Sequence, residues 1–178
     1  LNIVSVWKFH VDWARVALST LTGPTNVGTT TSWSQFTGAS QRVPSPASAL
    51  DTLYPRLMMQ NQYSNIGGIE SLWNSHTVGA SGASSAQASA RYYQVKVTGG
   101  TPEATATQAF TYSPADTLNR FMHSVAVNKN GDMALGYNTV NATTNPAIVY
   151  AGRLAADPVN TISLTEQTLV AGAGTQSG

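Results

Sequence analysis

Apolar and polar residues alternate along most of the chain, which is typical of β-strands that bury one face. In residues 4–13, VSVWKFHVDW, the side chains of Val6, Lys8, His10 and Asp12 fall on one face and aromatic residues fall on the other. Four further stretches alternate in the same way: 90–98, 103–113, 147–154 and 161–172. Because Thr, Val, Tyr and Trp are also common in these stretches, the pattern predicts an all-β protein.

Residues 120–140, RFMHSVAVNKNGDMALGYNTV, predict a β-hairpin around an Asn-Gly turn. A similar outline occurs earlier, at residues 56–78, where Asp51 and Arg56 take the places that Asp116 and Arg120 take in the second copy. A third and a fourth strand follow each hairpin. We therefore expect two units of four antiparallel strands, each built in the same order.

Repeated four-stranded units predict a β-propeller, since each unit has two faces that only its neighbours can bury. We expect a fragment of about two and a half four-stranded blades. Residues 1–45 are assigned to the last strands of a partial blade and a connecting loop, 46–114 to a second blade and 115–178 to a third. All would belong to one domain of a larger protein. A β-sandwich is the alternative architecture.

Two and a half blades cannot close a ring, so partners are expected. They would be the remaining blades of the parent protein or identical copies of this chain. The start of the chain in an apparent strand, without Met, also predicts a piece of something larger. Helix signals are weak: a short helical turn is expected at 46–53, and loops are expected at 22–48 and 77–90.

The amino-acid composition limits which partners and which cellular location can be expected for this chain. Charged residues make up 10% of the chain, against roughly 25% in an average soluble domain, and Ser and Thr supply much of the polar surface. The net charge is +1 and the basic residues are scattered, which argues against a nucleic-acid partner. There is no cysteine and no apolar run long enough to span a membrane. A secreted or cell-surface location is expected.

One loop could bind a cation. Asn128, Asn130 and Asp132 place side-chain oxygens at alternate positions, as in a calcium loop, although an EF-hand would have Glu where this chain has Thr139. The other interpretation is a hairpin turn in which Asn-Gly supplies a positive φ. No cofactor is expected apart from this possible calcium.

Several residues are candidates for catalysis or ligand binding. His10 and Asp12 share a strand face, and His76 is a further potential base. Arginines at equivalent positions of the two units, Arg56 and Arg120, could bind a carboxylate or phosphate, or could pair with the nearby Asp51 and Asp116. The catalytic candidates are His10, Asp12, His76 and Arg120, and the ligand-binding candidates are Trp33, Arg56 and Arg120.

Aromatic residues have two expected uses. Trp33 lies in a polar loop, TTTSWSQF, and would contact a ligand if exposed. The others are expected mainly to fill gaps between sheets: Trp7, Trp13, Trp73, Tyr54, Tyr92 and Tyr137. The chain has no G-x-S-x-G motif, no phosphate-binding loop and no pair of acids at diagnostic spacing.

Three segments carry a family resemblance: FHVDW (9–13), residues 119–141 and residues 148–176. There the chain resembles a group of large secreted bacterial proteins, mostly uncharacterised, with a β-propeller-like repeat region. The resemblance implies a secreted or surface location and assigns no catalytic residues.

Function is expected to be binding or scaffolding, with a glycan or a peptide as a possible ligand. One alternative is an extracellular hydrolase acting on glycans or peptides. The other is a structural subunit of a filament or surface layer, in which an unpaired sheet edge is completed by the next copy.

Overall fold

The computed structural model describes residues 3–80 and 86–176, so part of the loop expected at 77–90 lies outside the described residues. The regular elements of the described chain are β-strands and three 3-10 turns of three residues each, which confirms the all-β prediction. The turns are η1 (Val16–Leu18), η2 (Ala39–Gln41) and η3 (Thr98–Gly100). The strands are β1 (Ile3–His10), β2 (Thr20–Gly28), β3 (Arg42–Val43), β4 (Leu50–Asp51), β5 (Leu57–Ile66), β6 (Ile69–Gly79), β7 (Ala88–Lys96), β8 (Gln108–Tyr112), β9 (Asn119–Val127), β10 (Met133–Val140), β11 (Ala147–Arg153) and β12 (Leu164–Val170).

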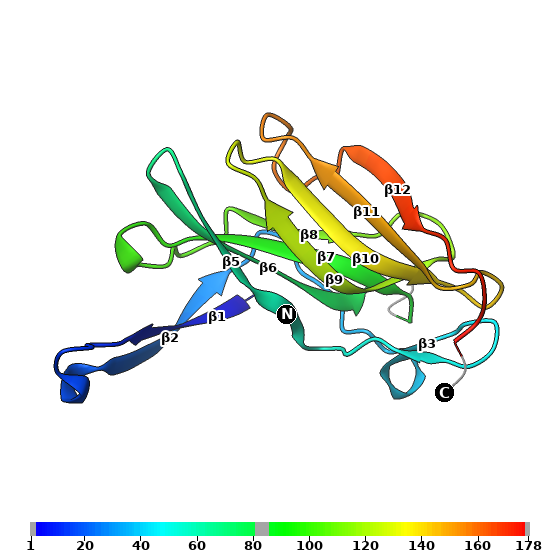
Figure 1. The fold of residues 1–178 in the computed structure, drawn as a ribbon, viewed down its shortest axis with the longest axis horizontal. Coiled ribbons are helices and arrows are strands. Elements are labelled where there is room, and N and C mark those ends of the chain that lie inside the picture. Colours follow the sequence, from blue (N-terminus) through cyan, green and yellow to red (C-terminus); the bar gives the residue numbers. More distant parts are fainter. Residues whose placement is uncertain (1–2, 81–85, 177–178) are drawn as a thin grey trace.

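Most strands belong to two four-stranded antiparallel sheets in which neighbours along the chain are neighbours in space. One sheet has the order β5-β6-β7-β8 and the other the order β9-β10-β11-β12. The two sheets lie one over the other, and the far end of the β1–β2 hairpin extends away from them (Figure 1). None of the described sheets closes on itself.

Strict alternation along β6 and β7 divides their side chains between two buried faces. One face meets the inner face of β10 and β11 and forms a hydrophobic core between the two sheets. Three aromatic residues expected to fill such a gap, Trp73, Tyr92 and Tyr137, are 3%, 0% and 2% exposed there. The buried members of this core are Trp73, Ala90, Tyr92, Met133, Leu135, Tyr137, Val149 and Ala151.

The opposite face of β7 and β8 is covered by the β1–β2 hairpin. Tyr93 and Val95 pack there with Val27 of β2, and Val4 and Val6 of β1 lie against them. The loop between β2 and β3 continues this cover, since its Trp33 contacts His76 on the same face. Phe36 of this loop and Val43 of β3 are buried in a third core with Ala88, Phe121 and Val140. The β5–β8 sheet is therefore the middle of three layers.

β2 was not predicted, because Gly23 and Pro24 were interpreted as part of a loop. In the structure, the pairing of β1 with β2 shifts between Val6 and Lys8, so that a β-bulge accommodates both residues. Gly23 has a φ of +126°, and a Cβ at that position would lie 2.9 Å from the carbonyl oxygen of Val6. A bulge on an outer strand tolerates Pro because no ladder hydrogen bond is lost.

Two other predictions were wrong. No helical turn forms at 46–53, where the described backbone makes bends and the short strand β4. Trp7 and Trp13 do not fill a gap between sheets: they are 57% and 89% exposed, because Val4 and Val6 form the inward face of β1. Among the described residues, no helix is long and apolar enough to cross a membrane, in agreement with the sequence.

We expect Leu135→Ala to destabilise the protein by about 2–5 kcal/mol, because it leaves a cavity in the core between the sheets. Leu135 is fully buried, whereas Leu169 on β12 is 67% exposed. Leu169→Ala is therefore the matched control, with an expected loss below about 0.5 kcal/mol. Urea denaturation of both variants measures the difference, and equal losses would contradict the assignment of this core.

Candidate functional site

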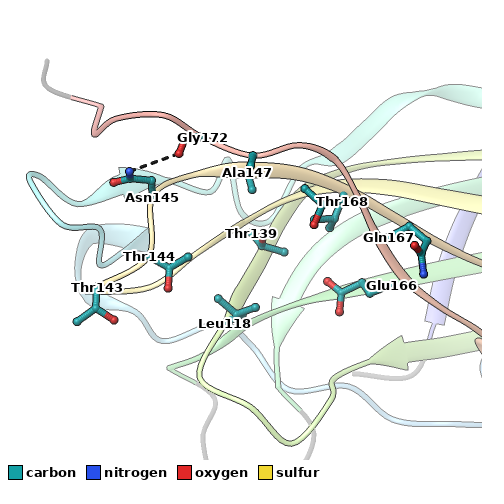
Figure 2. A pocket seen from close by; sticks show the side chains of 12 residues that line it. Leu118, Thr139, Thr143, Thr144, Asn145, Ala147, Glu166, Gln167, Thr168 and Gly172 are labelled. Carbon is teal, nitrogen blue, oxygen red and sulfur yellow. Dashed lines mark hydrogen bonds between the residues drawn. The ribbon is translucent and has the colours of Figure 1, made fainter.

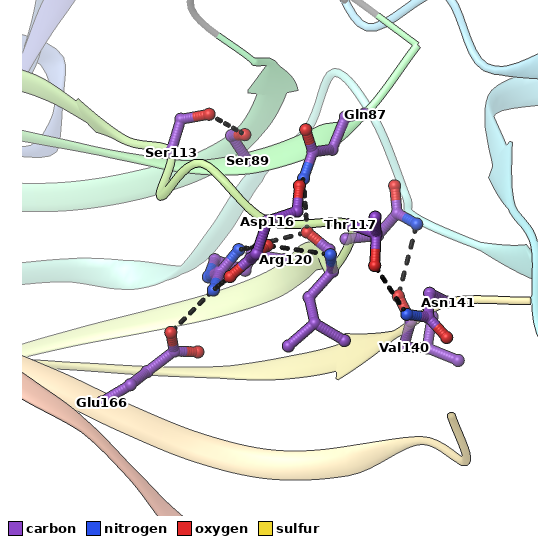
Figure 3. Close-up of polar contacts among 11 residues, drawn as sticks. Gln87, Ser89, Ser113, Asp116, Thr117, Arg120, Val140, Asn141 and Glu166 are labelled. Atoms are coloured by element: carbon purple, nitrogen blue, oxygen red, sulfur yellow. Dashed lines mark hydrogen bonds and ion pairs between the residues drawn. The ribbon is translucent and has the colours of Figure 1, made fainter. Parts of the chain in front are cut away.

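Arg120 is the centre of a charged cluster on the inner face of the second sheet. Its side chain is 1% exposed. Nη1 and Nη2 donate to Oδ1 and Oδ2 of Asp116 at 3.0 and 2.7 Å, and Nη2 also donates to Oε2 of Glu166 at 2.7 Å (Figure 3). Asp116 precedes β9 and Glu166 lies on β12, so the guanidinium joins the first strand of the sheet to the last.

The charges of this cluster stabilise one another. Burial alone would lower the pKa of Arg120, but hydrogen bonds to Asp116 and Glu166 raise it above its ordinary value. Burial would raise the pKa of Asp116, but the hydrogen bond from Arg120 brings it below its ordinary value. Asp116 is therefore ionised at neutral pH, and no proton donor is available at this carboxylate.

Aromatic rings lie behind the cluster. The guanidinium carbon of Arg120 is 5.5 Å from the ring centre of Tyr112, which contacts Tyr137 at 6.3 Å. Tyr137 in turn contacts His123 at 5.8 Å between ring centres. Burial lowers the pKa of His123 to about 3, so this imidazole is neutral in the folded protein.

A cleft of about 590 Å³ opens beside Glu166. Its walls come from β10, β11 and β12, from the β10–β11 connection and from the segment that follows β12 (Figure 2). Glu166 contributes a partly buried carboxylate, whose side chain is 22% exposed. The lining residues are Leu118, Thr139, Thr143, Thr144, Asn145, Ala147, Val149, Glu166, Gln167, Thr168, Ala171 and Gly172.

One end of the cleft is closed by a tight contact between two segments. A Cβ on Gly172 would lie 1.8 Å from the carbonyl oxygen of Pro146, so only glycine fits at this position. The side-chain amide of Asn145 donates to the carbonyl oxygen of Gly172 at 3.4 Å (Figure 2). Hydroxyl, amide and carboxylate groups thus surround a partly apolar floor, an arrangement that can bind a neutral, hydroxyl-bearing molecule.

His76 lies on the other face of the β5–β8 sheet, away from the cleft. Its Nε2 is 2.8 Å from the hydroxyl of Tyr93, which also accepts a hydrogen bond from Nε of Arg91 at 2.9 Å. Trp33 covers the imidazole edge-on, with ring centres 5.0 Å apart. Burial and then the charge of Arg91 lower the pKa of His76 to about 4. Trp33 is therefore partly buried against a neutral histidine, and it is not the exposed ligand platform that the sequence suggested.

The structure separates the remaining candidates. His10 is exposed at the end of β1, and Asp12 lies in the following turn, where Oδ1 accepts hydrogen bonds from the backbone N–H groups of Ala14 and Arg15 at 3.0 and 2.7 Å. Arg56 is exposed just before β5. Of the two arginines at equivalent positions, Arg120 makes the predicted pair with aspartate, and Arg56 makes no ion pair within the described chain.

The three residues of the possible calcium loop form a hairpin turn. Oδ1 of Asn128 accepts hydrogen bonds from the N–H groups of Asn130 and Asp132 at 2.9 and 3.1 Å. Oδ2 of Asp132 accepts one from Nδ2 of Asn128, and Oδ1 accepts one from the N–H of Ala155, both at 2.9 Å. Gly131 supplies the positive φ of +91°. These oxygens are occupied by the turn itself, and a calcium ion would have to displace their hydrogen bonds.

Sequence reasoning missed Glu166 and the cleft threonines. β12 pairs irregularly with β11, with two shifts in register, so simple alternation does not give the direction of Glu166. Nothing in the sequence places residues 118, 145 and 166 together. Comparison with family models, with curated proteins and with solved structures finds no match to this chain. The resemblance to secreted bacterial proteins therefore depends on the sequence segments alone.

We expect Arg120→Met to destabilise the protein by about 3 kcal/mol, because two carboxylates lose their shared cation. This value is at the low end for a broken buried pair, since the Asp116 side chain is 38% exposed and can be rehydrated. Arg56→Met removes the same charge from an exposed position and should cost less than about 0.5 kcal/mol. Urea denaturation of the Arg120→Met and Arg56→Met variants distinguishes these two costs. An unchanged urea midpoint for Arg120→Met would show that the charged cluster does not stabilise the fold.

Stability should also fall in mild acid because of the buried histidines. In the unfolded chain they titrate near 6.5, so below that pH the unfolded state binds more protons than the folded one. The loss runs from pH 6.5 down to about 4 for His76 and about 3 for His123, with a slope of up to about 1.4 kcal/mol per pH unit for each. His123→Phe should flatten this dependence in equilibrium denaturation, and His10→Phe, at an exposed site, should not. Identical pH profiles for wild type and His123→Phe would contradict the prediction.

Proposed function

We propose that this chain is part of a secreted or surface-exposed β-propeller and acts as a binding module. The proposed ligand is a hydroxyl-rich glycan that enters the cleft beside Glu166. The observation that carries the binding role is the cleft itself, a volume of about 590 Å³ lined by threonine hydroxyls, amides and one carboxylate. Such groups both donate and accept hydrogen bonds, as sugar hydroxyls require.

The stacking of the sheets supports the propeller. The second sheet packs face to face on the first: β9 contacts β5, β6 and β7, residues of β10 and β11 share a core with β6 and β7, and β12 is largely exposed. Successive four-stranded antiparallel sheets that stack face to face suit blades arranged around an axis. The β1–β2 hairpin covers the third and fourth strands of the next sheet, as the last two strands of a preceding blade would.

The cleft favours binding over hydrolysis. Glycoside hydrolysis normally uses one protonated carboxyl group and one carboxylate. Here Arg120 binds both Asp116 and Glu166, and it lowers the pKa of Asp116 instead of raising it. Neutral His123 lies behind the aromatic rings and has no hydrogen-bond partner of normal geometry among the described residues. A cluster in which both carboxylates are already paired with Arg120 suits recognition of an uncharged ligand.

A structural role is the second candidate, because apolar residues are exposed on the outer faces of the stack. Trp7 and Phe9 of β1 are 57% and 68% exposed, and Ile148 and Tyr150 of β11 are each 46% exposed. Further blades of a parent protein or identical copies of this chain could cover these faces. Assembly of the purified chain into rings or filaments at micromolar concentration would favour this second role.

The binding role is tested with a glycan array and with Thr144→Val/Thr168→Val, a double variant that removes two cleft hydroxyls without changing side-chain volume. We expect wild type to bind a neutral glycan saturably. The affinity of the double variant for that glycan should be lower by roughly tenfold or more. Thr22→Val, on an exposed position of β2, is the matched control and should bind as wild type does.

Three outcomes would contradict the proposal: no glycan binds, the cleft variant binds as tightly as wild type, or the chain hydrolyses its ligand. Circular dichroism confirms that each variant is folded before its binding is compared.

A further inference from the structure

A second hollow, of about 260 Å³, lies between the two sheets at the opposite end from the cleft. The end of β5, the start of β6, the β9–β10 turn and the segment after β11 are part of its lining. These connections lie at one end of the sheets (Figure 1), whereas the β10–β11 connection, which lines the cleft, is at the other. Each sheet contributes to the hollow, so it exists only because the sheets stack.

Arg153, at the end of β11, lines this hollow and is 4% exposed. Its Nη2 donates to the backbone carbonyl oxygens of Ala155 and Asp157, and its Nε has no hydrogen-bond partner in the described structure. Within the described residues Arg153 forms no ion pair. Burying a cation without an anion costs free energy of folding. An anion that binds next to Arg153 would reduce this cost.

The acids nearest to Arg153 are engaged elsewhere. Oδ2 of Asp157 accepts hydrogen bonds from the N–H of Leu154, at 2.7 Å, and from the hydroxyl of Ser163. Asp132 is held in the β9–β10 turn by Asn128 and Ala155. Both carboxylates sense the charge of Arg153, which contributes to the lowering of their pKa values, but neither reaches ion-pair distance.

The other two buried arginines are better compensated. Arg120 has two carboxylates, and Arg91 uses Nε, Nη1 and Nη2 in hydrogen bonds to Tyr93, Thr111 and Thr31. Nε has no hydrogen-bond partner in either Arg120 or Arg153, but Arg153 also has no carboxylate within ion-pair distance among the described residues. Its charge is therefore the least compensated of the three, and its side chain lines the hollow.

A second cation faces the same hollow. Lys96 of β7 lines it, and none of the described lining residues is Asp or Glu. The remaining polar groups are neutral: Gln94 and Gln108, joined by a 2.6 Å hydrogen bond, and the hydroxyls of Ser64 and Ser71. Trp73 forms part of the wall together with Ile66, Ile69 and Val159. Two cations and an apolar wall together match an organic molecule that carries a negatively charged group.

We infer that this hollow is a binding site for a small organic carboxylate, held by Arg153 and Lys96 with its carbon body against Trp73. A carboxylate is planar and accepts two parallel hydrogen bonds from a guanidinium. The apolar wall favours organic acids over inorganic oxyanions, which have no apolar surface to bury. The site is independent of the glycan cleft, since it uses other residues at the other end of the sheets.

The test titrates wild type with acetate, benzoate, a monosaccharide uronate, phosphate and sulfate, and follows tryptophan fluorescence and thermal stability. We expect benzoate or the uronate to bind saturably and to raise the melting temperature. Acetate, phosphate and sulfate should bind roughly tenfold more weakly or not at all. Binding should weaken as salt is added.

Lys96→Met should reduce the affinity roughly tenfold or more. Lys129→Met is the matched control: it removes the same charge from the exposed part of the neighbouring turn, outside the lining, and should change affinity less than about twofold. Arg153→Met should abolish binding, and circular dichroism shows whether it folds. The cleft variant Thr144→Val/Thr168→Val should bind carboxylates as wild type does, which separates this site from the glycan site.

The inference is overturned if no organic carboxylate binds folded wild type at up to about 50 mM, an affinity too weak for a built site. It is also overturned if phosphate or sulfate binds as tightly as benzoate and the uronate do. If Lys96→Met and Lys129→Met lose the same affinity for the carboxylate, the ligand is attracted only by the net charge of the protein. This result would overturn the inference as well.

Discussion

Burial of both faces of the β5–β8 sheet is the constraint on which the rest of the structure depends. On one side Trp73 and Tyr92 pack into the core shared with β10 and β11. On the other, Tyr93 and Val95 pack beneath β1 and β2. Because successive residues of a strand point to opposite faces, both layers are specified by the same nine residues of β7. A shift of one residue in the register of β7 would exchange the two sets and disrupt both interfaces at once.

This arrangement also explains why so many polar groups are buried in a chain with few charges. Three arginines, Arg91, Arg120 and Arg153, are 0%, 1% and 4% exposed. Arg91 lies on the middle sheet, and Arg120 and Arg153 lie on the sheet stacked against it. Little solvent reaches these three side chains, so each cation has to be compensated locally. Arg120 is compensated by carboxylates and Arg91 by neutral oxygens, whereas Arg153 is compensated in part and adjoins a hollow. The differences between these three environments distinguish structural arginines from a candidate ligand-binding one.

The two candidate sites follow from the geometry of antiparallel sheets. Connections of successive strands alternate between the two ends of a sheet, so the β10–β11 connection builds the cleft and the β9–β10 turn builds the hollow. The cleft carries hydroxyls and a carboxylate, and the hollow carries two cations. A single scaffold thus presents two chemically different surfaces at its two ends.

The sequence by itself determined the all-β class, the positions of most strands and the burial of Trp73, Tyr92 and Tyr137, because these depend on local alternation and on aromatic area. It also indicated the pair of Asp116 with Arg120, whose members are four residues apart. Only the tertiary structure decided that Trp7 is exposed and that Trp33 covers His76, since both depend on which layer packs on a given face. The cleft and the hollow were likewise beyond local patterns: Glu166 joins Arg120 across 46 residues, and Lys96 joins Arg153 only because two sheets stack. Such contacts arise from chain topology and from the shifted register of β12, neither of which hydrophobic periodicity encodes.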